Sequence, residues 1–440
     1  MHDDSSSFDV AVVGGGASGI FFLLAWVRLH PCSRVVWIRD PDSVGVAYDS
    51  QVSGHLLNVP ADRMGALAAD PAGFLVWLQR TQPSRGITAQ QFVPRSDYGD
   101  YLRWQVTNIH AAANVHSVHQ RLQSLRKVTQ PEKQNHDASG RHDLWQLSTG
   151  DGAVYLARRV LLALGAGLPS DPGNGDNLVA NPWSWLQRNP AMPPLSFQTR
   201  VVIFGSGLTA MDLVLALRER GHQGEIEVVS RSGCWSAAHE PTPALEPDVR
   251  EAFINDLLAS PSCRSYLIVF RRYALRHPWR ALFDAIRPAS QSLWVALAAP
   301  ERRRFLRHLF GLWNRHRHRA PPVVAEEIKR DSKLRLSKQR ITRASDPFPT
   351  AEAVERGQEI IAFDCRGLRL GSRAVRPSVV RDLEAEGWLR EGELGLGVQS
   401  TVPESLEIIG ALRFGIDFEC TAVPELRNHA ALIAERWSEV

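Results

Sequence analysis

An α/β fold with two Rossmann-like dinucleotide-binding units and a helical insertion is predicted by three features of the sequence. Glycines follow an apolar run at the G-x-G-x-x-G spacing from residue 14, and a second run repeats the arrangement as G-x-G-x-x-A from residue 205. Between residues 240 and 330 the apolar side chains instead recur with a helical period. Because 440 residues exceed the usual size of one core, more than one domain is expected.

The first unit begins almost at the N-terminus. Residues 10–13 are apolar, as in a strand buried on both faces of a parallel sheet. Gly14 makes the tight turn, Gly16 lets the backbone approach a diphosphate, and Gly19 allows helix and strand to pack closely. The phosphates would lie at the N-terminus of the following helix, where N–H groups favour an anion. The expected contacts are Gly14, Gly16, Ala17, Ser18 and Gly19.

The ends of the two second strands differ in charge and predict two different cofactors. In the first unit Asp40 ends the strand, ~20 residues after the glycines, where a carboxylate binds a ribose 2′-hydroxyl. In the second unit Ser230 takes that position and Arg231 follows it, which suits a 2′-phosphate because a guanidinium binds phosphate with a fork of hydrogen bonds. We therefore expect FAD in the first unit and NADPH in the second. The contacts expected for NADPH are Gly205, Gly207, Leu208, Thr209, Ser230 and Arg231.

The rest of the N-terminal half alternates loops, helices and strands. A structured loop without a regular period is expected over residues 55–64, because glycine and proline punctuate the stretch. Three domain segments follow from the pattern: residues 1–165 as the first part of an FAD domain, 166–365 as an NADPH domain, and 366–440 as the return to the FAD domain. The other expected elements are helices at 71–78 and from 92 to about 110, strands between about 113 and 162 with a polar turn at 130–141, a hinge at 169–173, and strands within 333–363.

An arginine- and histidine-rich run at residues 302–319 lies inside the predicted helical insertion of 240–330. One interpretation is a solvated helix face opposite an apolar stripe. The other is a surface that faces an anionic ligand or a cofactor. His316 and His318 are two residues apart and point in different directions on a helix, so no metal site is expected.

The C-terminal segment predicts a strand at 406–410 and a final helix that runs to about Trp437. Thr421 is the expected cap of this helix. Its first N–H groups could stabilise negative charge on a reduced flavin, or the helix could be an ordinary capped one. The expected flavin contacts here are Thr421, Ala422 and Val423.

Composition limits the class of protein. The five cysteines form no C-x-x-C pair, which argues against a disulfide framework, a structural zinc site and a disulfide reductase. The net charge is only +4, and no stretch approaches the ~18 apolar residues of a membrane span. The polar first residues carry no secretory signal, so a cytoplasmic protein that binds neither nucleic acid nor membrane is expected.

Four motifs carry a family resemblance. Residues 55–64, 92–102, 205–210 and 421–427 resemble the bacterial FAD/NAD(P)-binding protein family, over essentially the whole chain. More distantly, the chain is similar to class B flavin monooxygenases, which include N-hydroxylating and Baeyer–Villiger enzymes. That resemblance implies that Asn58, Pro60 and Met64 lie at the flavin, with Leu57 as a further contact. The F-x-G-x-x-x-H-x-x-x-W signature is missing, which argues against Baeyer–Villiger chemistry.

Together these features predict an FAD-dependent, NADPH-using oxidoreductase. The preferred reaction is monooxygenation of a small molecule by O₂ through a C4a-hydroperoxyflavin, with nitrogen as a candidate position, in specialised metabolism. Asn58 would order the nicotinamide or hydrogen-bond the peroxide, although a turn asparagine fits the same pattern. His55 and His239 are candidate proton donors or structural histidines. Two alternatives stay open: a flavin oxidase or reductase without oxygen insertion, and a non-catalytic flavoprotein whose segment 301–319 binds a macromolecular partner.

Overall fold

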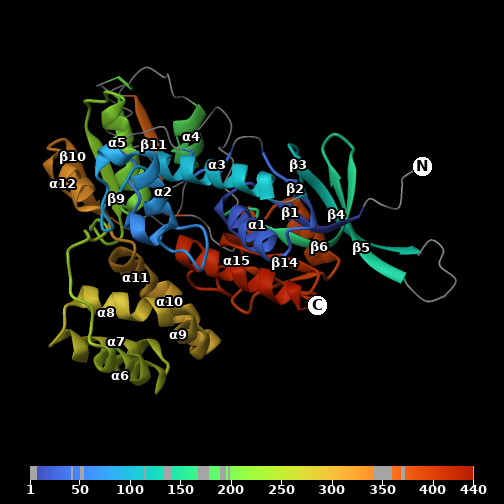
Figure 1. Cartoon of the computed structure of the whole chain (residues 1–440). Coiled ribbons are helices and arrows are strands. Elements are labelled where there is room, and N and C mark those ends of the chain that lie inside the picture. Colours follow the sequence, from blue (N-terminus) through green and yellow to red (C-terminus); the bar gives the residue numbers. More distant parts are fainter. Residues whose placement is uncertain are drawn as a thin grey trace. The chain divides into compact units, whose positions relative to one another are not determined.

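The chain forms two compact units in a computed structural model (Figure 1). Unit 1 comprises Met1–Asp49, Val59–Gly167 and Arg369–Val440, and unit 2 comprises Ser50–Asn58 and Leu168–Leu368. The predicted hinge at 169–173, most of the turn at 130–141 and much of the stretch 333–363 lie outside the described residues. The structure describes residues 7–40, 43–49, 54–112, 114–131, 141–166, 178–188, 195–196, 199–339, 359–367 and 372–439.

Unit 1 is built on a sheet with the strand order β3-β2-β1-β6-β5-β4, and β14 pairs with β6. Strands β1, β2, β3, β6 and β14 run parallel, whereas β5 is antiparallel to both β4 and β6. Val10, Ala11 and Val12 are fully buried, as their apolar run predicts. The strands are β1 (Phe8–Val13), β2 (Arg34–Ile38), β3 (Asn114–Val118), β4 (Leu122–Pro131), β5 (Arg141–Thr149), β6 (Val154–Leu162) and β14 (Leu406–Ile408).

Helix α1 follows the first glycine turn and packs against α3 and α15. Aromatic rings fill the contact between α1 and α15: Phe22 lies edge-on to Trp437, with ring centroids 5.5 Å apart. The remaining elements of unit 1 include the antiparallel pair β12 (Leu389–Glu391) and β13 (Val398–Ser400). The helices of unit 1 are α1 (Ala17–Leu29), α2 (Gly73–Thr81), α3 (Arg95–Ala112), α14 (Ser378–Ala385) and α15 (Val423–Ser438).

The predicted capping role of Thr421 is wrong. The N-cap residue of α15 is Ala422, and no side chain accepts a hydrogen bond at this end of the helix. Pro424 lies in the first turn, where its missing N–H costs no hydrogen bond. The helix therefore starts two residues after Thr421, and its first turn presents backbone N–H groups without a capping side chain.

Unit 2 contains a second, fully parallel sheet with the order β10-β9-β8-β11-β7. Its central strand β8 leads into the second glycine turn and helix α5, as predicted. The elements are β7 (Leu178–Val179), α4 (Pro182–Arg188), β8 (Arg200–Phe204), α5 (Leu208–Glu219), β9 (Ile226–Ser230), α12 (Pro322–Arg330), β10 (Leu334–Lys338) and β11 (Ile360–Asp364).

The helical insertion between β9 and α12 belongs to unit 2 (yellow to orange in Figure 1). Its core contains Phe253, Phe270 and Phe283, whose rings pack edge to face. The bridge between Ala238 and Ala320 ties the start and the end of the insertion together. Its helices are α6 (Pro247–Leu258), α7 (Cys263–Ala274), α8 (Trp279–Ile286), α9 (Ser290–Ala296), α10 (Ala299–His308) and α11 (Phe310–Arg317).

Candidate dinucleotide sites

The two glycine turns have the same backbone geometry, each in its own unit. Gly14 has a φ of +119° and Gly205 a φ of +103°, values that L side chains rarely adopt. A Cβ atom on Gly14 would lie 2.2 Å from the carbonyl oxygen of Ala163, and one on Gly205 would lie 2.3 Å from that of Cys365. In both units the turn is therefore pressed against the residue that follows the neighbouring parallel strand, β6 or β11.

The second glycine of each G-x-G motif, Gly16 or Gly207, faces open space. A Cβ on Gly207 would meet nothing within 4 Å, and the nearest atom to one on Gly16 would be the Cα of Gly45 at 3.9 Å. Gly16 and Gly207 are the N-caps of α1 and α5, and neither helix has a side-chain cap. Each turn thus offers backbone N–H groups and the room that a diphosphate needs, so both fit a dinucleotide.

Several predicted contacts of unit 1 gather near the start of α1. Gly410, which follows β14, has a φ of +92°, and a Cβ there would lie 3.2 Å from the Oγ of Ser18 and 3.8 Å from Leu426 of α15. The connection that carries Thr421, Ala422 and Val423 therefore lies in the same part of the unit. Asp40 is exposed just beyond β2, with its carboxylate 3.8 Å from the guanidinium of Arg121.

Met64 is buried in unit 1, and α15 fixes the backbone around it. The buried Arg427 of α15 donates hydrogen bonds to the carbonyl oxygens of Arg63 at 3.0 Å and Gly65 at 2.8 Å. The segment with Met64 is thus attached to the final helix.

The segment with His55, Leu57 and Asn58 belongs to unit 2. His55 is fully buried, and its Nε2 donates to the carbonyl oxygen of Asp212 in α5 at 2.8 Å. His239 Nε2 donates to the carbonyl oxygen of Asn58 at 3.1 Å. Both histidines therefore hold this segment on unit 2, and the contact of Asn58 and His55 with a flavin stays a prediction.

His239 is expected to make unit 2 less stable in acid. Burial, with a smaller contribution from Arg319, lowers the pKa of His239 from 6.5 to about 4. The unfolded chain binds this proton below pH 6.5 while the folded chain does not, so the unfolding free energy falls as pH drops from 6.5 towards 4.

Urea unfolding of the His239→Gln variant at several pH values checks this expectation. Glutamine keeps a donor to Asn58 but does not titrate, so its stability should depend less on pH in that window than that of the wild type. An unchanged pH dependence would contradict the assignment. His429 of unit 1, whose pKa burial also lowers to about 4, provides the comparison variant His429→Gln.

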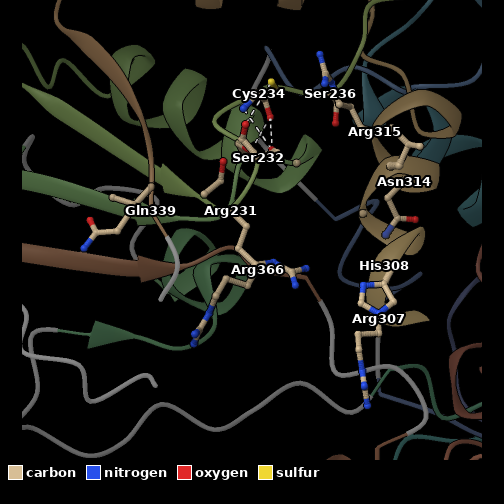
Figure 2. A pocket seen from close by; sticks show the side chains of 17 residues that line it. Arg231, Ser232, Cys234, Ser236, Arg307, His308, Asn314, Arg315, Gln339 and Arg366 are labelled. Atoms are coloured by element: carbon tan, nitrogen blue, oxygen red, sulfur yellow. Dashed lines mark hydrogen bonds between the residues drawn. The ribbon is translucent and has the colours of Figure 1, made fainter. Parts of the chain in front are cut away.

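The second glycine turn opens into a cavity of about 810 Å³ within unit 2 (Figure 2). This volume is within the usual range of ligand pockets. One wall comes from the carboxyl ends of β8 and β9, and the other from helices α10 and α11. The lining residues are Gly205, Ser206, Gly207, Val229, Ser230, Arg231, Ser232, Cys234, Ser236, Arg307, His308, Gly311, Leu312, Asn314, Arg315, Gln339 and Arg366.

The cavity favours an anion. Four arginines line it, and none of the described lining residues is an aspartate or a glutamate. Arg366 is paired with Asp364 at 2.6 Å, and its hydrogen bonds with this carboxylate raise the pKa of Arg366. The predicted residues Ser230 and Arg231 therefore lie together with the second glycine turn in one cationic site.

The sequence leaves two interpretations of the basic run open, a solvated helix face and a surface that faces an anionic ligand or a cofactor. The helical period does not show which members of the run face the sheet. In the structure Arg307, His308 and Arg315 line the cavity, whereas Arg317 and Arg319 are buried elsewhere. Over the described residues, no group of three or more His, Cys, Asp or Glu side chains is placed to hold a metal ion.

Fold and turns together define the class of proteins with two dinucleotide-binding units. Residues 11–167 match the family model described as FAD-NAD(P)-binding, which confirms FAD and NAD(P) as the cofactor class. A comparison with curated protein sequences gives no match. Within the described part of the chain, no helix is both long and apolar enough to cross a membrane.

Solved structures of ornithine and lysine hydroxylases share this fold. The ornithine N-hydroxylase of Kutzneria sp. 744, with reduced FAD, NADP⁺ and L-ornithine, is 13% identical, with 98% of this chain and 99% of that chain covered and a TM-score of 0.63. An ornithine hydroxylase from Pseudomonas aeruginosa is 15% identical over 98% and 99% of the two chains, with a TM-score of 0.59. L-lysine 6-monooxygenase from Pseudomonas syringae is 15% identical, with 98% of each chain covered and a TM-score of 0.52. The predicted fold class and the distant resemblance to N-hydroxylating flavin monooxygenases are confirmed.

Proposed function

We propose that the chain is an FAD-dependent, NADPH-using monooxygenase that oxygenates a small amine at nitrogen. One observation carries the cofactor assignment: a second glycine turn opens into a cavity lined by arginines, in a chain whose first turn matches the FAD-NAD(P)-binding model. The amine as substrate class is supported by the similarity to ornithine and lysine hydroxylases.

In this proposal each unit binds one cofactor through its own backbone. The N–H groups after Gly16 bind the diphosphate of FAD, and Asp40, just beyond the next strand, accepts a hydrogen bond from its ribose. The N–H groups after Gly207 bind the diphosphate of NADPH. The uncapped first turn of α15 directs its N–H groups at the flavin, where they stabilise negative charge. Bound FAD supplies the transfer of electrons from NADPH to O₂.

Oxygen insertion is tested by measuring whether NADPH oxidation produces hydroxylated amine or only H₂O₂. Purified protein with FAD, NADPH and O₂ is incubated with L-ornithine, L-lysine and other primary amines, while hydroxylated product and H₂O₂ are measured. Amine-dependent NADPH consumption with formation of hydroxylamine supports the proposal. NADPH consumption that gives only H₂O₂ with every amine would favour a flavin oxidase, and no consumption would favour a non-catalytic flavoprotein.

Arg231→Ala is expected to weaken binding of NADP⁺ by roughly 10- to 100-fold, because it removes charge-assisted hydrogen bonds to the 2′-phosphate. NAD⁺ lacks this phosphate, so its affinity should change little. Calorimetric titration of both nucleotides checks the difference, and Arg231→Lys, which keeps the charge but loses the fork, should fall between. An equal loss of affinity for NADP⁺ and NAD⁺ would show that Arg231 does not bind the 2′-phosphate.

A further inference from the structure

Two helices of the insertion form the wall of the cavity opposite β8 and β9 (Figure 2). Arg307 and His308 come from the last turn of α10, and Asn314 and Arg315 come from α11. A Rossmann unit alone binds a dinucleotide at the carboxyl ends of its strands. Here the cavity also has polar and cationic side chains on the opposite side.

The two arginines of this wall differ from Arg366 in their partners. Within the described part of the chain, no carboxylate forms an ion pair with Arg307 or Arg315, whereas Arg366 binds Asp364. A guanidinium without a carboxylate partner, in a cavity lined by three further arginines, favours an anion as its ligand.

Backbone hydrogen bonds fix α11 beside the end of β9. The N–H of Ala237 donates to the carbonyl oxygen of Arg315 at 2.9 Å, and the N–H of Ala320 donates to that of Ala237 at 2.8 Å. Trp313 is buried against Phe283, with ring centroids 5.5 Å apart. The backbone of α11 at Arg315 is therefore fixed before any ligand binds, which lowers the entropy lost on binding.

We propose that Arg307 and Arg315 bind phosphate groups of the nicotinamide dinucleotide, so that the helical insertion is the second half of its binding site. This inference rests on the proposed function, because it takes the nicotinamide cofactor as the ligand of the cavity. The chemistry that the arginines recognise is a phosphate, which is either the 2′-phosphate or the diphosphate. Either assignment makes the insertion a determinant of cofactor affinity.

Calorimetric titration of the full-length protein with NADP⁺ and with NAD⁺ tests the proposal. Arg307→Ala and Arg315→Ala should each weaken binding of NADP⁺ about tenfold or more, as expected for the loss of a charge-assisted hydrogen bond. If only the affinity for NADP⁺ falls, the arginine binds the 2′-phosphate. If the affinity for NAD⁺ falls equally, the arginine binds the diphosphate. Arg271→Ala is the matched control, since Arg271 is exposed on α7 and does not line the cavity.

The outcomes separate this inference from the proposed function. If the wild type binds NADP⁺ and both variants bind it as tightly as the Arg271→Ala control, the role of the insertion is overturned while the proposed function stands. If the wild type does not bind NADP⁺, the proposed function itself fails. Thermal unfolding of each variant shows that it is folded, and Arg315→Lys, which keeps the charge, should recover part of the affinity lost in Arg315→Ala.

Discussion

Replacement of Gly14 by alanine is expected to lower the unfolding free energy of unit 1 by roughly 2 to 5 kcal/mol, from a strained φ and an overpacked contact together. The φ of +119° disfavours any side chain, and the new methyl group would lie 2.2 Å from the carbonyl oxygen of Ala163. Because the turn that begins at Gly14 joins β1 to α1, the variant should also lose FAD. Urea unfolding and the FAD content of the purified protein measure both effects.

Gly86→Ala is the matched control in the same unit. Gly86 has a φ of +57°, but a Cβ there would meet nothing within 4 Å. Its cost should therefore be only the ~1 kcal/mol of placing alanine in a left-handed conformation. Similar destabilisation by both substitutions would show that the close contact between Gly14 and the carbonyl oxygen of Ala163 does not contribute to the loss of stability.

Gly207→Ala is expected to weaken NADP⁺ binding strongly while the protein stays folded and retains FAD. The φ of −82° at Gly207 is allowed for alanine, and no protein atom lies within 4 Å of the added methyl group. That open space is where the diphosphate must approach the backbone, so the methyl group would displace the ligand and not the protein. Calorimetry with NADP⁺ should show a loss of roughly 100-fold or more, the size of a steric cost of about 3 kcal/mol.

Gly16→Ala should give the reverse pattern, with FAD lost and NADP⁺ still bound. Its φ of −75° is also ordinary, so the comparison tests ligand approach in unit 1 without backbone strain. Normal NADP⁺ affinity in Gly207→Ala, or normal FAD content in Gly16→Ala, would contradict the assignment of that turn.

The nucleotide units were predictable because their signals are local. Glycine spacing, an apolar strand and the residue at the end of the next strand all lie within one βαβ unit. The structure accordingly places Ser230 and Arg231 beside Gly205 and Gly207 in one cavity, as the sequence predicts.

The parts that sequence reasoning missed depend on contacts between distant segments. Residues 54–58 have no regular period, and contacts with distant parts of the chain, among them the hydrogen bonds of His55 and His239, place them in unit 2. The helical period of residues 302–319 separates apolar from charged faces but does not show that Arg307 and Arg315 face the second glycine turn. Thr421 fits a cap by residue type, yet the helix begins two residues later, with Ala422 as its N-cap and Pro424 in its first turn.

The most direct test of two cofactors on one chain is an anaerobic titration of the purified, FAD-loaded protein with NADPH and with NADH. The visible absorption of the flavin is followed during each titration. We expect one FAD per chain, full bleaching by one equivalent of NADPH, and much slower bleaching by NADH. A protein that does not retain FAD, or one whose flavin NADPH leaves oxidised, would contradict the account.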